Sequence, residues 1–588
     1  MAERSASELS RPRRVRGERR QRYTWWQRLR AGMYGRAPLL VESLLALALI
    51  ALVVLVDTGY FLSVRDAGNL GQALLDTISL LTLNPAVRPG PDDSFGAALV
   101  VFNLLFSVLF VQSVLNSARA LFTRRPEETR QLGRAAALRD HVIVCGLGRI
   151  GMRVVTRLVE AGYQAVVVER NWGAEFVPSA LEMRVPVVAG DARDAATLRR
   201  AGLRRACAVI AGIDGDLVNV EIALAARAER PNMRVILRAF SEDFDRGLER
   251  GFGRDTAFSA SALAAPSFAA ATVTREIEHV LPLDGELLGV ARVSLRPADA
   301  TPTGLRALEA RYDVRFAPEP PRAGHATVMG RLPSLEALRL AGATLDAAHA
   351  QPTPFQPGAQ HDTVIVCGLG KVGYRVVGLL HTLRPRPRIV VLYHERDEDE
   401  PFLRRVRGLD GVEVRRGDAR DGETLRDAGL DRAFAVAALT SDDLTNVQIG
   451  LEARRQRADL HVVLRVFSDT LAERLVDLFG IHTAYSVSDL ASPTLAAAAV
   501  LGGVGHAFFA ADRLYAMDEL PVRIGDRLSG RSIEAIRGET GAVVIGLRRA
   551  GGPLLVLPPT ATLIAPGDTI TLAAPLNTLA RLRSTGGS

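Results

Sequence analysis

Residues 141–151 read HVIVCGLGRIG, and residues 363–373 read TVIVCGLGKVG. In both stretches a short apolar, β-branched run leads into the pattern G-x-G-x-x-G, and the glycines lie 222 positions apart. Further along, GDARD at 190–194 returns at 417–421, an offset of 227 that one five-residue insertion near 385–399 explains. Shorter matches at the same offset pair Asn219 with Asn446, Leu237-Arg238 with Leu464-Arg465, Phe240-Ser241 with Phe467-Ser468, and Pro266 with Pro493. The chain therefore contains a tandem duplication of a unit of roughly 220 residues.

Each unit predicts a strand, a tight turn and a helix, followed by a second strand that ends in an acidic residue. The first two glycines permit the turn and the close approach of a phosphate to the helix N-terminus, and the third lets helix and strand pack closely. The acid is Glu169 in the first unit and Glu395 in the second, and a carboxylate there can accept hydrogen bonds from ribose hydroxyls. The pattern predicts NAD, NADH or another adenine nucleotide as ligand, although Arg170 beside Glu169 leaves NADP open.

Further strands are predicted at 185–189, 208–211 and 234–238, with helices between them, so each unit is expected to be an α/β, doubly wound parallel sheet. Ligands of such sheets bind at the carboxyl ends of the strands. The expected cofactor-binding residues of the first unit are Gly146, Gly148, Arg149, Ile150, Gly151, Glu169, Arg170, Asp191, Ala192, Ile213 and Asp214. Those of the second unit are Gly368, Gly370, Lys371, Val372, Gly373, Glu395, Asp418, Ala419, Thr440 and Ser441. The alternative for either unit is a fold that has lost its ligand and keeps the glycines for packing.

Composition excludes several other classes of protein. The 588 residues suffice for three or four domains. The net charge of +8 arises within residues 1–38, which hold 11 Arg and 3 Glu. Aromatic residues make up only 5% of the chain. Both observations argue against a nucleic-acid-binding face. Three cysteines and ten scattered histidines predict neither a disulfide framework nor a metal site. We find no catalytic motif or positioned acid and base, so no catalytic residue and no enzyme is expected.

Two apolar segments near the N-terminus predict membrane spans. Residues 39–56 and 95–115 are 18 and 21 residues long, close to the roughly 20 that a bilayer crossing needs. A cleaved signal peptide is the alternative for the first, but no small-residue cleavage site follows it. Arginines precede the first span and follow the second, so we expect a multi-pass protein of the cell membrane with both termini cytoplasmic.

The loop between the spans contains the apolar stretch 73–83, which as a helix would cross only about half of the hydrocarbon core. We interpret it as a re-entrant pore helix; the alternative is an amphipathic loop on the outer surface. The order of helix, half-helix and helix resembles the two-span potassium channels, whose filter reads Thr-Val-Gly-Tyr-Gly. Here the corresponding pore residues are Thr82, Leu83, Asn84, Pro85 and Ala86. Because they include no glycine, the chain departs from the filter that gives potassium selectivity, and two alternatives stay open: a weakly selective cation pathway, or a pore that conducts only in some other arrangement.

A two-span pore, a short linker and glycine-motif units with Gly-Asp-Ala together resemble channels with RCK (TrkA-N and TrkA-C type) domains. The tail at 520–582 also resembles an RCK C-terminal subdomain, and the matching stretch 286–343 is degenerate. The expected division of the chain is 1–38 basic segment, 39–116 membrane domain, 117–140 linker, 141–285 first Rossmann domain, 286–343 first C-terminal subdomain, 344–361 linker, 362–512 second Rossmann domain and 513–588 second C-terminal subdomain.

The resemblance implies a homotetramer in which eight RCK units form a ring beneath the pore and a nucleotide alters the geometry of that ring. The expected function is a nucleotide- or ion-regulated cation channel, with potassium as the expected ion. Two alternatives stay open. The first is a membrane-anchored nucleotide sensor that regulates potassium transport without conducting, and the second is a membrane-attached dehydrogenase.

Overall fold

The computed structural model describes residues 51–63, 69–81, 94, 97–98, 100–103, 105, 126–239, 251–253, 255–274, 276–322, 324–343, 361–394, 401–467, 475, 481, 483–511 and 513–585. The filter residues 82–86, most of both predicted spans and Glu395 lie outside the described residues.

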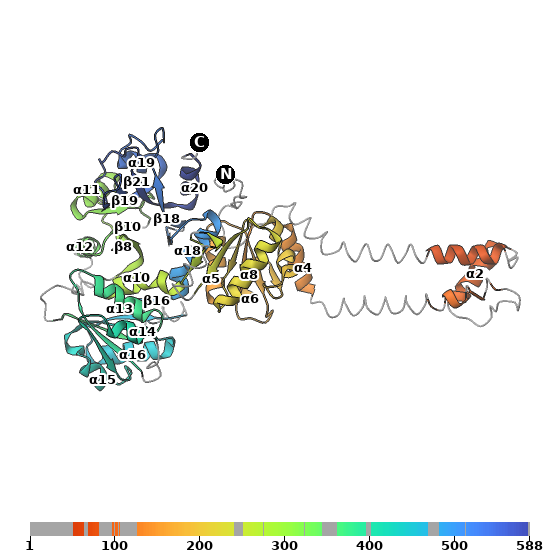
Figure 1. Ribbon diagram of the computed structural model, residues 1–588, viewed down its shortest axis with the longest axis horizontal. Helices are drawn as coiled ribbons and strands as arrows, with labels where there is room; N and C mark the ends of the chain where they lie inside the picture. The colour runs from red at the N-terminus through yellow and green to blue at the C-terminus, as the bar shows by residue number, and fades with distance from the viewer. Residues whose placement is uncertain are drawn as a thin grey trace.

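The first unit is a six-stranded parallel sheet in the order β3-β2-β1-β4-β5-β6. Its strands are β1 (Val142–Cys145), β2 (Ala165–Glu169), β3 (Val187–Ala189), β4 (Ala208–Ala211), β5 (Arg234–Arg238) and β6 (Ala257–Phe258). Its helices are α4 (Pro126–Ala137), α5 (Arg149–Glu160), α6 (Val177–Glu182), α7 (Ala195–Arg200) and α8 (Asp216–Glu229). Figure 1 shows α4, α5, α6 and α8 around the sheet of this unit. The central strands are buried on both faces, which is why they read as continuous apolar runs.

The second unit repeats this sheet in the order β13-β12-β11-β14-β15-β16. Its strands are β11 (Thr363–Cys367), β12 (Arg388–Tyr393), β13 (Val412–Arg416), β14 (Ala433–Ala438), β15 (His461–Arg465) and β16 (Thr483–Tyr485). Its helices are α13 (Gly373–Thr382), α14 (Pro401–Arg407), α15 (Gly422–Asp427) and α16 (Asp443–Gln456). The prediction of two α/β Rossmann-like sheets is confirmed.

Two helices cross between the units. Helix α10 (Ala260–Val273) follows the first sheet but packs against α13 of the second, and α18 (Val487–Leu501) follows the second sheet but packs against α5 of the first. Both are rich in alanine and buried on nearly every face, as a helix enclosed between two domains must be. Figure 1 shows α10 and α18 between the two sheets. The exchange joins both units in one hydrophobic core.

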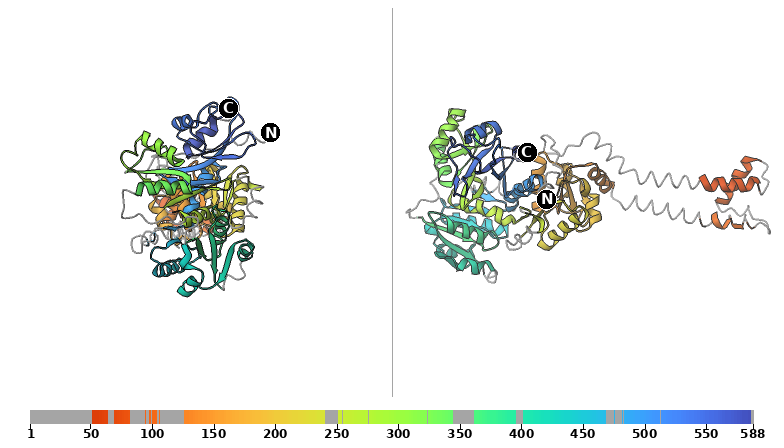
Figure 2. Two further views of the ribbon diagram at one scale, coloured as in Figure 1. Left: turned by 90° about the vertical axis from the view of Figure 1, so that its left-hand side faces the viewer. Right: turned by 45° about the horizontal axis from the view of Figure 1, so that its top comes forward.

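After each crossing helix comes an antiparallel sheet, and the two sheets share a hydrophobic cluster. The first contains β7 (Ile277–Leu283), β8 (Glu286–Ser294), α11 (Pro302–Tyr312), β9 (Val314–Phe316), β10 (His325–Arg331) and α12 (Leu332–Ala343). The second contains β17 (His506–Ala510), β18 (Arg513–Pro521), α19 (Ile533–Thr540), β19 (Val543–Arg548), β20 (Leu554–Val556), β21 (Thr569–Pro575) and α20 (Leu576–Thr585). Figure 2 shows these subdomains side by side in green and blue.

The element order is the same in both C-terminal subdomains except for the added β20, so the stretch that is degenerate in sequence keeps the fold. Both expected boundaries, 286 and 513, fall after the first strand of the subdomain's sheet. Strand β7 contains Pro282, a residue that disguises a strand in sequence because proline cannot donate to the ladder.

In the N-terminal part, residues 51–63 are helical and α2 (Leu70–Leu81) matches the helix expected at 73–83. Contacts join the pieces: Thr58 Oγ1 lies 3.1 Å from Thr77 Oγ1, and Asn103 Nδ2 donates to Asp57 Oδ1 at 3.2 Å. Tyr60 and Phe61 pack with Ala73 of α2. Among the residues that the structure describes, no helix combines the length and apolar character needed to cross a membrane.

Candidate functional site

The first unit has a cavity of about 860 Å³ at the carboxyl ends of its parallel strands. We call it the first cleft. The predicted residues that line it are Gly146, Gly148, Arg149, Ile150, Glu169, Arg170, Asp191, Ala192, Ile213 and Asp214. Only Gly151 of the predicted set does not line it. The fold therefore brings segments from four strand ends to one opening.

The glycine loop depends on backbone freedom and close packing. Gly146 has φ of +91°, and a Cβ there would lie 2.7 Å from Ile213 Cγ1. A Cβ on Gly151 would lie only 2.0 Å from the carbonyl oxygen of Gly146, so this glycine serves helix packing. A Cβ on Gly148 meets nothing within 4 Å. Gly148 is the N-cap of α5 and supplies no side-chain cap, so the N-terminus of α5 at the cavity is suited to an anion.

Glu169 closes the glycine loop against β2. Its carboxylate accepts hydrogen bonds from the backbone N–H of Leu147 at 2.8 Å and of Asn171 at 2.9 Å. A carboxylate has about four lone-pair directions, so capacity remains for a ribose diol. The acid is thus positioned by the backbone rather than by other side chains.

Asp191 and Asp214 are each engaged by an arginine. Arg193 forms a fork on Asp191, with Nη2 to Oδ2 at 2.7 Å, and its guanidinium and backbone N–H lower the pKa of Asp191 to about 2. Arg238 Nη2 lies 3.2 Å from Asp214 Oδ1. Both arginines line the cavity, although neither was among the residues that the sequence predicted for it.

A buried asparagine fixes the loop after β4. Asn219 Nδ2 donates to the carbonyls of Ile213 at 2.9 Å and Arg238 at 2.8 Å, and its Oδ1 accepts the N–H of Ile213 at 3.0 Å. Asn446 repeats the arrangement with Thr440 and Arg465. In the sequence, this asparagine stood out because it recurs at the offset of the duplication.

The second unit completes the wall of the first cleft. Arg465 at the end of β15, Phe467, Val487 and Ser488 all line the cavity. The guanidinium carbons of Arg149 and Arg465 lie 4.5 and 4.8 Å from the ring centre of Phe467. These residues come from the unit opposite the glycine loop, so sequence reasoning within one unit missed them.

The corresponding cleft of the second unit, the second cleft, measures only about 320 Å³. Of the predicted residues, Gly368, Asp418, Ala419, Thr440 and Ser441 line it. Gly370, Lys371, Val372 and Gly373 do not line it, and Glu395 lies outside the described residues.

The position at which α13 begins explains why residues of the second glycine loop do not line the second cleft. This helix begins at Gly373, whereas α5 begins two positions earlier in the repeat, at Arg149. Arg375 Nη1 donates to the carbonyl of Lys371 at 2.8 Å and to Ser261 Oγ of α10, also at 2.8 Å. The turn that would face a phosphate is held by the crossing helix instead.

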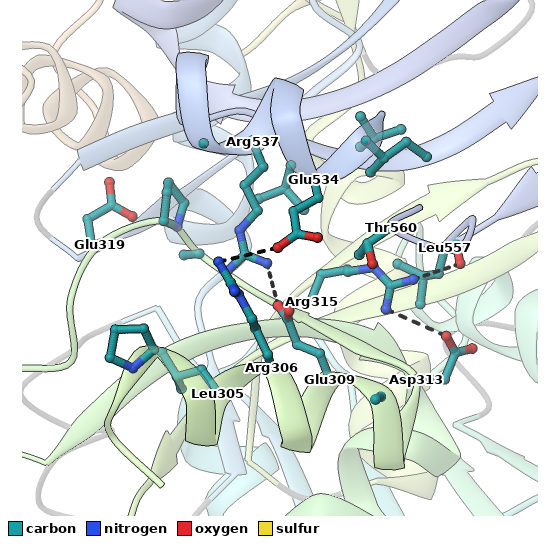
Figure 3. A pocket seen from close by; sticks show the side chains of 18 of the residues that line it. Leu305, Arg306, Glu309, Asp313, Arg315, Glu319, Glu534, Arg537, Leu557 and Thr560 are labelled. Atoms are coloured by element: carbon teal, nitrogen blue, oxygen red, sulfur yellow. Dashed lines mark hydrogen bonds and ion pairs between the residues drawn. The ribbon is translucent and has the colours of Figure 1, made fainter. Parts of the chain in front are cut away.

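A third cavity, of about 670 Å³, lies between the two C-terminal subdomains (Figure 3). Two ion pairs join the subdomains across it: Arg537 Nη1 to Glu309 Oε1 at 2.6 Å, and Arg306 Nη2 to Glu534 Oε1 at 3.3 Å. Arg315 is buried and donates to the carbonyls of Leu557 and Pro558. The groups that line this cavity largely satisfy one another.

The described part of the chain shows neither a reactive cysteine nor a metal site. Burial raises the pKa of Cys207 and of Cys367 to about 12, so neither thiol is a ready nucleophile. Within those same residues, no group of three His, Cys, Asp or Glu side chains is placed to hold a metal ion.

The TrkA-N domain pattern matches residues 142–260 and again residues 364–487, and the TrkA-C domain pattern matches residues 518–585. Together these matches cover more than half of the chain. The chain therefore belongs to the family of TrkA-N/TrkA-C, or RCK, domain proteins. It carries two TrkA-N domains in tandem, as the duplication predicts, and a TrkA-C domain at the end.

Similar proteins include "Probable potassium channel protein 2" of Methanocaldococcus jannaschii, 24% identical over 217 residues, or 35% of this chain and 62% of the relative. An uncharacterized protein of Methanothermus fervidus is 27% identical over 146 residues, or 24% of this chain and 21% of the relative. The match thus spans between a fifth and three fifths of these relatives' length. A solved structure described as "GsuK channel bound to NAD" shares the fold, with a TM-score of 0.50, 19% identity and coverage of 93% of this chain and 99% of that one.

Proposed function

We propose that this protein is a nucleotide-regulated cation channel, with potassium as its ion. In this proposal the N-terminal part forms a two-span pore, and the tandem RCK units form the regulatory ring. The observation that carries the proposal is the first cleft, where a glycine loop, the open start of α5 and the acid at the end of β2 surround one cavity. Catalysis is not part of the proposal.

The proposed ligand is NAD, NADH or another adenine nucleotide. Its phosphates would lie at Gly148 and the first turn of α5, and its ribose hydroxyls would bond Glu169. The GsuK channel, which shares this fold, is described as bound to NAD, and that supports the same ligand class here. The second cleft is smaller, and residues 370–373 at the start of α13 do not line it, so the proposal places the nucleotide in the first cleft.

Contacts in the N-terminal part support a channel-like packing. Helix α2 contacts residues 51–63 through Thr58 and Thr77, and the same helical stretch reaches Asn103 through Asp57. A half-length helix that follows one apolar segment in the sequence and precedes another is the order of a two-span pore. We propose a homotetramer in the cell membrane with both termini cytoplasmic, and weak selectivity because residues 82–86 contain no glycine.

Gating requires more than binding. A nucleotide shifts the pore equilibrium only if it binds the open and closed rings with different affinities. Four chains would supply all eight units of the ring, so the nucleotide would act on contacts within and between chains.

The test is recording from the full-length protein in planar bilayers, with potassium and sodium, in the presence and absence of NAD, NADH, ADP and ATP. We expect cation currents whose open probability changes with at least one nucleotide. Gly148→Glu places a carboxylate where the phosphate would lie, in open space, and should abolish the response. Gly370→Glu, also in open space but outside the second cleft, is the matched control and should preserve it.

The remaining outcomes are also informative. Nucleotide binding without current under any condition would support a membrane-anchored regulator that does not conduct. Absence of nucleotide binding by the folded wild-type chain would refute the proposed function.

A further inference from the structure

We propose that Arg465 of the second unit binds a phosphate group of the nucleotide in the first cleft. This inference rests on the proposed function and extends it. The site is then composite, and a ligand with two phosphates, such as a nucleoside diphosphate or a dinucleotide, connects the two units.

The position of Arg465 supports this role. It lies at the carboxyl end of β15 and lines the same cavity as Gly148 and Arg149, although its own glycine loop is in the other unit. Its guanidinium and that of Arg149 both lie within 5 Å of the ring centre of Phe467. One aromatic ring thus holds two cations, one from each unit, at the wall of the cleft.

The backbone around Arg465 is fixed in advance. Asn446 Nδ2 donates to the carbonyl of Arg465 at 2.8 Å. The N–H of Phe467 donates to both carboxylate oxygens of Asp443, at 3.0 and 2.9 Å. The arginine therefore does not need a loop rearrangement to present its side chain to the cavity, which favours binding.

The charge of Arg465 is poorly compensated. Among the described residues its guanidinium forms no ion pair or hydrogen bond, and its Nε is buried without a partner. Burial lowers the pKa of Arg465, since loss of hydration disfavours the charged form. Asp443 acts on it electrostatically, but the Asp443 carboxylate is already used by the N–H of Phe467.

The equivalent residue in the duplication shows the contrast. Arg238 also lines the first cleft, and it forms an ion pair with Asp214 at 3.2 Å. Buried charges are ordinarily paired because an uncompensated one is costly. An anion in the first cleft would supply the charge that Arg465 lacks.

The consequence is a specific recognition rule. Arg149 from α5 and Arg465 from β15 would divide two phosphates between them, and neither forms an ion pair in the described part of the chain. A ligand without phosphate would contact only the glycine loop and Glu169. Phosphate-dependent affinity should therefore depend on the second unit.

The experiment is equilibrium binding of NAD, ADP and adenosine to the purified full-length protein in detergent, by isothermal titration calorimetry. A hydrogen-bonded charge pair contributes enough that Arg465→Gln should weaken NAD and ADP binding by about 10- to 100-fold. Adenosine binding should change by less than about 2-fold. Arg465→Lys keeps the positive charge but cannot donate the two parallel hydrogen bonds of a guanidinium. It should therefore bind ADP more tightly than Arg465→Gln and less tightly than the wild-type protein.

Arg234→Gln is the matched control. Arg234 is a half-buried arginine at the opposite end of β5 that donates to the carbonyls of Ala499 and Val500 in α18, so it joins the units away from the cleft. Circular dichroism and elution volume report folding of every variant. Equal losses for Arg234→Gln and Arg465→Gln, or unchanged ADP affinity in Arg465→Gln, would overturn the inference and leave the proposed function standing. Failure of the wild-type protein to bind any nucleotide would instead overturn the proposed function.

Discussion

Replacing Arg537 by methionine tests how the two C-terminal subdomains hold together (Figure 3). Glu309 accepts from Arg537 Nη1 at 2.6 Å and from the N–H of Phe316 at 2.8 Å, and the Glu309 side chain is only 7% exposed. Removing the arginine leaves the buried carboxylate without the cation that donates to it. Breaking a buried pair in this way costs about 3 kcal/mol or more.

The assay is amide hydrogen exchange of the peptide that contains β9, since the Phe316 N–H bonds directly to Glu309. A loss of about 3 kcal/mol in local opening free energy corresponds to roughly 100-fold faster exchange. The matched control is Glu534→Gln, which breaks the other pair across the same cavity. Its members, Arg306 and Glu534, are 73% and 54% exposed, so we expect a change below about 1 kcal/mol. Equal exchange rates in the two variants would refute the reasoning from burial.

Three further predictions concern the glycine loop, the stoichiometry of binding and acid stability. Gly151→Ala should lower stability by about 1–3 kcal/mol in thermal unfolding, because its Cβ meets backbone at 2.0 Å, whereas Gly148→Ala should be tolerated. Calorimetric titration of the full chain should give one nucleotide per chain; two equal sites would contradict the difference between the clefts. Burial lowers the pKa of His141, His279 and His506 from 6.5 to about 4, so the unfolded chain binds more protons between these values. The contribution of these histidines to stability is thus full above pH 6.5 and is lost as the pH falls to about 4, and His141→Gln should reduce this loss in acid titrations followed by circular dichroism.

The sequence predicted most of the first unit because its signals are local. The β-branched strands, the glycine spacing and the acid at Glu169 each act within one strand–turn–helix segment, and the structure has all of them where expected. Helix α2 also followed from a local apolar run. Local periodicity and turn chemistry therefore suffice for a doubly wound sheet.

The remaining features depend on contacts between distant residues. Arg465 and Phe467 were visible only as repeats of Arg238 and Phe240, and their placement in the opposite cleft depends on the exchange of α10 and α18. The glycine motif predicted binding residues in both units and left open whether each unit keeps a ligand; the contact of Arg375 with Ser261, more than a hundred positions away, could not be read from that motif. Repeated motifs fix a shared fold, and long-range contacts then decide whether each copy retains an open site.

The exchange of crossing helices within one chain has an evolutionary consequence. In a symmetric dimer of identical chains, each mutation appears on both sides of the axis, so a change that suits one cleft is imposed on the other. Covalent fusion removes that constraint while keeping the shared core. One half is then free to specialise in recognition and the other to reinforce it, which fits the unequal clefts of this protein.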